Sequence, residues 1–174
     1  DAAVEQALAG FEAAYNDYPQ EDIRHILIHG DLMSEAAIKK AAKLHITIAV
    51  QPAFLHWMEE PESYLTKILG ARAKQILPLR SMVDHGLLVT AGSDGPCTVP
   101  DPIYGIYAAC NHPDKAQSLT PLEALKTYTL WAAKSAGDDN LYGSLSAGKK
   151  ANFVVLDKNI LEVPNEAIKD IKLC

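Results

Sequence analysis

The chain has 174 residues and a mass of 18.9 kDa, which is enough for one domain with a core of its own. Hydrophobic residues make up 48% and charged residues 22%, so an intrinsically disordered, collagen-like or mucin-like chain is excluded. The 16 basic and 22 acidic residues give a net charge of -6 without a cluster of Lys or Arg, which argues against a nucleic acid partner. No apolar run approaches the ~20 residues of a membrane helix, so no membrane partner is expected.

The cysteines and the first residue bear on the compartment and on the extent of the chain. Cys97, Cys110 and Cys174 are odd in number and form no Cys-x-x-Cys pair, so neither a disulfide framework nor a structural zinc site is expected. A reducing, cytoplasmic compartment is the default prediction. The chain starts at Asp1 without a leader sequence, so any leader has been removed or was never there, and the missing Met suggests a fragment.

The N-terminal stretch predicts a helix followed by a strand. Apolar residues recur at spacings of three and four, as on one face of a helix over residues 2–16. The polar segment 16–22 contains a proline and is expected to end that helix. Residues 23–29 are rich in branched apolar side chains and have the length of a strand.

The following segments alternate between helix and strand. Ser34 is a plausible N-cap, and Gly86 is a plausible helix end. The predicted elements are helix 36–44, strand 46–50, helix 61–74, helix 78–85 and strand 87–91. Short, continuous apolar strands that alternate with helices are typical of a parallel sheet covered by helices. The predicted fold class is therefore α/β.

The last part of the chain begins with helices and then changes its pattern. A short helix is expected at 102–110, and Thr120-Pro-Leu-Glu123 is a capping box that begins a helix over 120–136. Gly137 is expected to end that helix. Beyond it, a glycine-rich turn leads into a predicted strand at 151–157, outside the earlier alternation. A second, smaller element is therefore expected to begin here.

Two residues with metal-binding or catalytic chemistry are predicted at one edge of this sheet. His29 ends the first strand and Asp94 follows the third, and ligands bind at the carboxyl ends of parallel strands. Imidazole and carboxylate are ligands of hydrolytic divalent metals, and a carboxylate can also take a proton from water. Taken alone, the sequence around Asp94 is more typical of an ordinary turn than of a catalytic site. His29 and Asp94 are therefore candidates for half of a metal site.

Other candidate residues have weaker support. His25 lies on the same side of its strand as His29 but ~13 Å lower, so it is expected in the core. A helical reading would make these two histidines a zincin-like pair, but the Glu that should follow the first histidine is absent. Cys97 has no evident base to activate it as a nucleophile. Arg80 is a candidate anchor for an anionic substrate, although an Arg in the first turn of a helix more often faces solvent or packs.

Several motifs, taken in their order and spacing, resemble the amidohydrolase superfamily. The motifs are Arg24-His-Ile-Leu-Ile-His29, Val50-Gln-Pro52, Pro78-Leu-Arg-Ser81, Asp84-His-Gly86, Gly92-Ser-Asp-Gly-Pro96, Thr120-Pro-Leu-Glu-Ala124, Gly143-Ser-Leu-Ser-Ala-Gly-Lys149 and Ala151-Asn-Phe-Val-Val-Leu-Asp157. The resemblance covers nearly the whole chain. It is greatest to the branch that holds N-substituted formamide deformylases and many uncharacterised amidohydrolases.

This resemblance implies a fold and a division of the chain. The family has a (β/α)8 TIM barrel with a small β-sandwich made from both chain ends. By this comparison, residues 1–137 correspond to the last three βα units of the barrel. Residues 138–174 correspond to the start of the C-terminal β-sandwich element.

The resemblance also implies a metal and roles for individual residues. The cofactor is expected to be a divalent metal, with zinc as the first choice. His29 matches a metal-binding histidine of the family, and Asp94 matches its final metal-binding Asp and general base. Gln51, which follows the middle strand, and Arg80 are the candidate substrate-binding residues for a small-molecule substrate.

The chain departs from the family's pattern at both ends. It has no His-x-His motif, which the family uses on its first barrel strand, and the family continues beyond the segment Ile168-Lys-Asp-Ile-Lys172. A partial barrel has unpaired sheet edges, which predicts either a homo-oligomer formed through those edges or strands that rearrange to cover one another. The chain alone is not expected to be an active enzyme.

Two functions follow from these observations. The first is part of a metal-dependent hydrolase that cleaves a non-peptide C–N bond of a small amide, formamide or imide with metal-activated water. The alternative is a noncatalytic remnant, or a binding or regulatory module that keeps the fold without a complete metal site. An upstream segment with a His-x-His motif would favour the enzyme.

Overall fold

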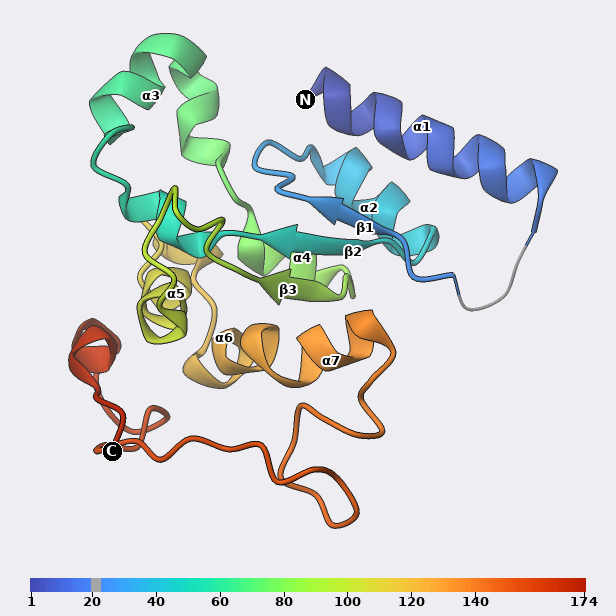
Figure 1. The fold of residues 1–174 in the computed structure, drawn as a ribbon. Helices are drawn as coiled ribbons and strands as arrows, with labels where there is room; N and C mark the ends of the chain where they lie inside the picture. The colour runs from blue at the N-terminus through green and yellow to red at the C-terminus, as the bar shows by residue number, and fades with distance from the viewer. Residues whose placement is uncertain (20–22) are drawn as a thin grey trace.

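A computed structural model describes residues 1–19 and 23–174 of the chain and contains a small parallel sheet (Figure 1). The strands are β1 (Ile26–Ile28), β2 (Thr47–Val50) and β3 (Val89–Ala91), arranged in the order β1-β2-β3. Ile28 pairs with Ala49, and Ala49 pairs with Thr90. Because all pairs are parallel, the carboxyl ends of the strands lie at the same edge of the sheet.

Helices connect and cover the strands. The α-helices are α1 (Ala2–Asp17), α2 (Glu35–Lys43), α3 (Glu62–Leu69), α4 (Leu79–Asp84), α5 (Pro102–Cys110), α6 (Pro121–Tyr128) and α7 (Leu130–Ala136). Short 3₁₀ helices are η1 (Pro52–His56), η2 (Gly70–Gln75), η3 (Lys115–Gln117) and η4 (Asn165–Asp170). Helix α2 packs against α1 and α4, whereas α6 and α7 pack against β3. Within the described ranges, no helix has both the length and the apolar character that crossing a membrane requires.

The first helices and strands confirm the sequence-based expectations. The Ser34 hydroxyl accepts a hydrogen bond of 3.1 Å from the Ala37 N–H and caps α2, as its position predicts. The Asp1 carboxylate caps α1 in the same way by accepting from the Val4 N–H at 3.0 Å. The strand expected at 23–29 is confirmed only over the three residues of β1. The predicted alternation of helix and strand therefore holds, with part of the expected polar segment 16–22 lying outside the described residues.

Two predicted helices are interrupted. The helix expected at 61–74 ends at Leu69, because Gly70 takes the left-handed conformation with φ 59° and the chain continues as η2. The helix expected at 120–136 divides at Thr129, where φ is -127° and ψ is -95°. The Thr129 hydroxyl donates to the Leu125 carbonyl at 2.8 Å, and such a bond competes with the helix backbone and bends helices. The prediction that both segments are helical is confirmed. The prediction that each forms one continuous helix is wrong.

The strand expected at 151–157 is absent. This segment makes a single antiparallel bridge, between Leu156 and Leu173, and the side chains of Phe153, Val154 and Val155 are exposed. A strand forms only when a neighbouring strand satisfies its backbone hydrogen bonds, and here the few residues before Cys174 are the partner. The sequence pattern thus indicated a propensity for β-structure. The described chain, however, lacks a strand that pairs with this segment along its length.

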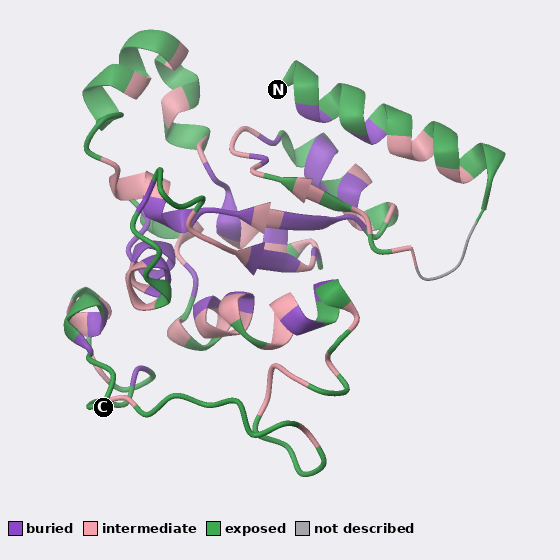
Figure 2. Ribbon diagram, in the orientation of Figure 1, coloured by how far each residue is buried: buried purple, intermediate pink, exposed green. Residues whose placement is uncertain are grey.

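The apolar core lies between the sheet and the helices (Figure 2). Fully buried side chains at its centre come from β2, β3, α2, α4 and α5, and include Ile38, Ile48, Val50, Leu79, Met82 and Val89. Each such burial contributes roughly 1.5–3 kcal/mol. The edge strand β1 is less protected, since Ile26 and Ile28 are 43% and 66% exposed. The sheet is therefore well covered at β2 and β3 and open at β1.

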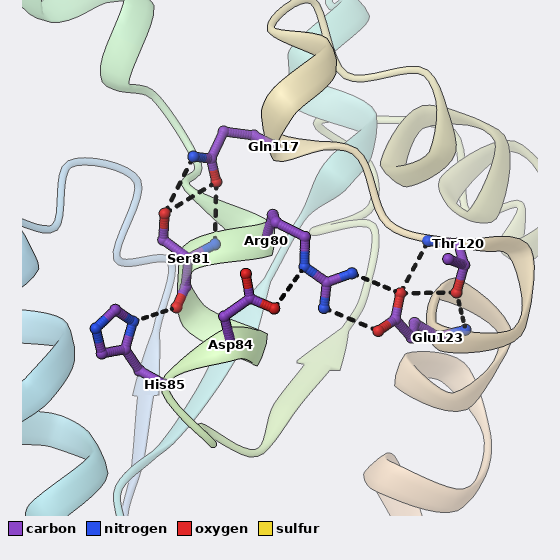
Figure 3. Close-up of polar contacts among 7 residues, drawn as sticks. All are labelled: Arg80, Ser81, Asp84, His85, Gln117, Thr120 and Glu123. Carbon is purple, nitrogen blue, oxygen red and sulfur yellow. Dashed lines mark hydrogen bonds and ion pairs between the residues drawn. The ribbon is translucent and has the colours of Figure 1, made fainter.

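Arg80 links α4 to α6 through carboxylates (Figure 3). Its guanidinium donates two hydrogen bonds of 2.8 Å to Glu123 and forms an ion pair of 2.9 Å with Asp84. Glu123 also completes the predicted capping box, because its carboxylate accepts from the Thr120 N–H at 2.9 Å. The hydrogen bonds from Arg80 lower the pKa of Glu123 to about 2, although burial acts in the opposite direction.

Replacing Glu123 with Ala is expected to lower the free energy of unfolding by about 2–3 kcal/mol at pH 7, because the Arg80 pair and the capping box are both lost. The folded-state pKa of Glu123 lies below its ordinary value of 4.5, so this stabilisation is present above pH 4.5 and disappears as the pH falls toward 2. Urea unfolding of the wild type and the variant between pH 7 and pH 3 should show a difference that narrows with falling pH.

The matched control is Glu62→Ala, because Glu62 is exposed in the first turn of α3. Its effect on the free energy of unfolding should stay within about 0.5 kcal/mol. A Glu123→Ala variant as stable as this control at pH 7 would contradict the role given to the Arg80 pair.

Candidate active site

His29 stands where β1 ends. Its N–H donates to the Ala49 carbonyl of β2 at 2.8 Å, so the residue is still hydrogen-bonded to the sheet. Its backbone then turns into the left-handed region with φ 70°, and Gly30 follows with φ 76°. Positive φ costs a non-glycine residue about 1–3 kcal/mol, although His adopts it more readily than most. The imidazole is therefore held at the carboxyl edge of the sheet on a strained backbone.

Asp94 lies at the same edge, in the turn that follows β3. The Gly92 N–H donates to the Val50 carbonyl at 3.0 Å, which holds the start of this turn against β2. Asp94 also has a positive φ of 53°, and its side chain is 47% exposed. Its Oδ2 atom lies 3.7 Å from Nε2 of His29. The structure thus brings together the two residues that the sequence placed at one edge.

The geometry of this pair suits two ligands of one divalent cation. Two ligand atoms at about 2.0–2.1 Å from a tetrahedral zinc lie about 3.4 Å apart, close to the 3.7 Å between His29 Nε2 and Asp94 Oδ2. Among residues 1–19 and 23–174, no group of three or more His, Cys, Asp or Glu side chains is arranged to hold a metal ion. The described chain therefore supplies a pair of ligands, which is part of a coordination sphere.

Asp31 is a residue of the site that sequence reasoning missed. Its Oδ2 atom lies 3.6 Å from Nδ1 of His29, the ring nitrogen that does not face Asp94. Burial raises the pKa of Asp31 and the nearby Glu60 carboxylate adds to this, whereas His29 acts in the opposite direction. The signal in the sequence was a carboxylate two residues after the histidine, but only the turn at Gly30 directs it back toward the ring.

A cavity of about 700 Å³ opens beside His29. Phe54 and Trp57, which follow β2, line it and make an edge-to-face contact with ring centroids 5.0 Å apart. The Phe54 ring also lies 6.1 Å from the His29 ring. Most of the remaining wall is apolar, including Leu27, Leu55, Leu65, Ile68, Leu69 and Ile76. The cavity is therefore an apolar space that reaches the imidazole.

The charged side chains that line this cavity are acidic. Asp31 and Glu60 contribute carboxylates, as does Asp1, and none of the described lining residues is Lys or Arg. Cys97 also lines the cavity, and its N–H donates to the Asp94 carbonyl at 2.9 Å. The cavity thus combines an apolar wall with negative charge.

The two predicted substrate-binding residues lie elsewhere. Arg80 is not among the residues lining this cavity, and its guanidinium pairs with Glu123 and Asp84, so its expected role as an anchor for an anionic substrate stays a prediction. Gln51 is buried, and its Nε2 donates to the Ala49 carbonyl at 3.1 Å, while its Oε1 has no hydrogen-bond partner among the described residues. Gln51 does not line the cavity either, although it follows the carboxyl end of β2.

His25 takes no part in the pair. Its ring packs on the rings of Phe11 and Tyr15 in α1, with centroids 4.8 and 5.8 Å away. It precedes a strand, so the helical, zincin-like arrangement of His25 and His29 is not formed. His25 therefore packs against α1, but it is only partly buried and lies outside the core in which it was expected.

Comparison with known proteins assigns the family. The sequence matches the amidohydrolase family over residues 1–173. The chain belongs to this family. The motifs that suggested the resemblance therefore identified it correctly.

Curated relatives of this amidohydrolase are longer proteins. N-substituted formamide deformylase of Arthrobacter pascens is 26% identical over 151 residues, which cover 83% of this chain and 26% of that protein. The protein LONG AFTER FAR-RED 3 of Arabidopsis thaliana is 29% identical over 168 residues, which cover 91% of this chain and 28% of that protein. The amidohydrolase chain thus spans about a quarter of the length of these relatives.

Solved structures share its fold. An uncharacterised metal-dependent hydrolase from Pyrococcus furiosus superposes with a TM-score of 0.77 at 25% identity, covering 93% of this chain and 32% of that one. A second such hydrolase, from Pyrococcus horikoshii, gives a TM-score of 0.73 at 22% identity and covers 95% of this chain and 34% of that one. The small parallel sheet and its helices therefore have the fold found in metal-dependent hydrolases.

Replacing His29 or Asp94 with Gly is expected to leave the free energy of unfolding unchanged or raise it by up to about 1 kcal/mol, because glycine adopts positive φ without penalty. Val99→Gly is the control, since Val99 is an exposed loop residue whose backbone is not left-handed, and a loss of about 0.5–1 kcal/mol is expected there. Urea unfolding measures all three. A loss above about 1 kcal/mol for both site variants would show that these side chains stabilise the fold.

Proposed function

We propose that this chain is the part of a metal-dependent amidohydrolase that carries His29 and Asp94, and that the enzyme hydrolyses a non-peptide C–N bond in a small molecule. The observation that carries this proposal is the distance of 3.7 Å between His29 Nε2 and Asp94 Oδ2, at the carboxyl edge of a parallel sheet. Membership of the amidohydrolase family supports it. So does the name of the Arthrobacter relative, which acts on an N-substituted formamide.

In this proposal both residues of the pair hold the metal, and Asp94 also transfers a proton. His29 holds a divalent metal, for which zinc is our choice, through Nε2, and Asp94 contributes a carboxylate oxygen. The metal, when bound, polarises the substrate carbonyl and activates water. Asp94 takes a proton from the attacking water and passes it to the departing nitrogen, which its half-exposed position beside His29 allows. Further ligands are needed, so this chain alone is expected to be inactive.

We further propose that the sheet is the last part of a (β/α)8 barrel, with residues 138–174 belonging to a small β-sandwich. The exposed side chains of Ile26 and Ile28 on β1 support this, because the remaining strands and helices of a closed barrel would cover β1, which would then have a neighbour on each side. The exposed Phe153, Val154 and Val155 support a strand that pairs elsewhere in the β-sandwich. A noncatalytic module is less well supported, because it gives no role to a histidine and an aspartate held 3.7 Å apart at the carboxyl edge of the sheet.

Replacing His29 with Ala or Asp94 with Asn is expected to lower zinc affinity by at least 10-fold and the hydrolytic rate by at least about 100-fold, since each change removes a metal ligand. Both are to be measured in the full product of the gene, by zinc titration and by hydrolysis of a panel of N-substituted formamides. His45→Ala is the matched control, because His45 is an exposed histidine that also has a positive φ, 53°. Unchanged zinc affinity in both site variants would contradict the proposal.

The cavity beside His29 supports a substrate with an apolar, aromatic group and no negative charge. Phe54 and Trp57 offer ring faces and edges for stacking. The carboxylates of Asp31 and Glu60 repel an anion and leave a neutral or cationic group as the substrate. An N-arylmethyl formamide has this chemistry.

Replacing Trp57 with Ala should therefore raise KM for an N-arylmethyl formamide about 10-fold, as expected when an aromatic contact worth about 1–1.5 kcal/mol is lost. KM for N-methylformamide, which lacks the aryl group, should change little. Tyr64→Ala is the control, because Tyr64 is an aromatic residue of α3 that does not line the cavity. An equal change in KM for both substrates would contradict a role of the cavity in recognising the aryl group.

A further inference from the structure

The His29 ring lies between two carboxylates. Asp94 approaches Nε2 at 3.7 Å, and Asp31 approaches Nδ1 at 3.6 Å. The two ring nitrogens direct their lone pairs or protons to different sides of the imidazole. Asp31 therefore does not share a metal ion with Nε2, and its contact with the ring needs a separate explanation.

The backbone fixes the position of Asp31. Gly30 turns the chain with φ 76°, and a Cβ atom at Gly30 would lie 3.2 Å from the Met33 sulfur and 3.3 Å from Ile48. On the other side, the Asp31 carbonyl accepts a hydrogen bond of 2.7 Å from the Leu77 N–H, just before α4. Two separate parts of the chain thus hold Asp31 beside the ring while its carboxylate stays half exposed.

We infer that Asp31 is a positioning residue whose carboxylate accepts the Nδ1–H of His29 and so leaves Nε2 unprotonated toward Asp94. This inference rests on the proposed function for its purpose, because an unprotonated Nε2 is what a metal ligand requires. A histidine ligand is commonly oriented by a carboxylate on its other nitrogen, and losing that partner lowers metal affinity 10–100-fold. The 3.6 Å distance is about 0.4 Å beyond a normal hydrogen bond, so the inference includes a small rotation of the half-exposed carboxylate toward Nδ1.

The first experiment measures the protonated nitrogen without any metal. Long-range ¹H–¹⁵N NMR spectra of the full product of the gene, recorded with a chelator at about pH 8.5, identify the tautomer of His29. The Nδ1–H fraction should fall in Asp31→Ala and persist in Asp31→Asn, because the amide oxygen still accepts a hydrogen bond. Glu60→Ala removes a neighbouring carboxylate of the same cavity and should leave the tautomer unchanged.

The second experiment measures affinity for zinc by titration calorimetry in the same variants. Asp31→Ala should bind 10–100-fold more weakly than the wild type, Asp31→Asn should recover most of the loss, and Glu60→Ala should change affinity less than about 3-fold. Circular dichroism of each variant checks the fold, which Asp31→Ala should preserve because the Leu77 hydrogen bond involves only the backbone.

The two experiments separate the inference from the proposed function. An identical tautomer in the wild type and Asp31→Ala overturns the positioning role, whether or not zinc binds. A zinc affinity of Asp31→Ala equal to that of Glu60→Ala also overturns it. If the wild type binds no zinc while the tautomer responds as expected, the proposed function fails and the positioning of His29 by Asp31 stands.

Discussion

Parallel pairing of three short strands is the constraint on which the rest of the structure depends. Each strand contributes only three or four residues, and their register aligns Ile28, Ala49 and Thr90 across the sheet. A shift of one residue would turn every side chain of a strand to the opposite face. The hydrogen bonds that follow the strand ends, from His29 to β2 and from Gly92 to β2, bring the two site turns to one edge. The site is thus a consequence of the sheet.

Stability and site chemistry are carried by different parts of the molecule. The turns that hold His29 and Asp94 place both residues at positive φ, which costs free energy. The buried core of β2, β3 and the covering helices offsets this cost, together with the Arg80–Glu123 pair that joins α4 to α6. Such separation is typical of sites built on loops that a rigid scaffold positions. Arg80 contributes to the scaffold, because its guanidinium pairs with Glu123 and Asp84.

The environment of His29 is acidic and apolar at once. Carboxylates of Asp31 and Asp94 flank its two ring nitrogens, and Phe54 lies against its ring. This combination favours a cation near the ring and disfavours an anion there. The family assignment and these contacts are independent observations, and both support the metal-dependent hydrolysis proposed above.

Sequence alone determined the features that depend on local interactions. The alternation of helix and strand, the Ser34 cap and the Thr120–Glu123 capping box follow from residues close together in the chain, and the motif order led to the amidohydrolase family. The placement of His29 and Asp94 at one edge could also be predicted from the sequence, because the carboxyl ends of parallel strands lie at the same edge of a sheet.

Only the tertiary structure decided the contacts between distant segments. It paired Arg80 with Glu123 over a separation of 43 residues and set Asp31 against the other nitrogen of His29. It also left residues 151–157 without the partner that a strand needs, and it divided the helix at Thr129. These outcomes depend on which backbone and side-chain groups come into contact in the folded chain. Residue type and spacing along the chain do not specify such contacts.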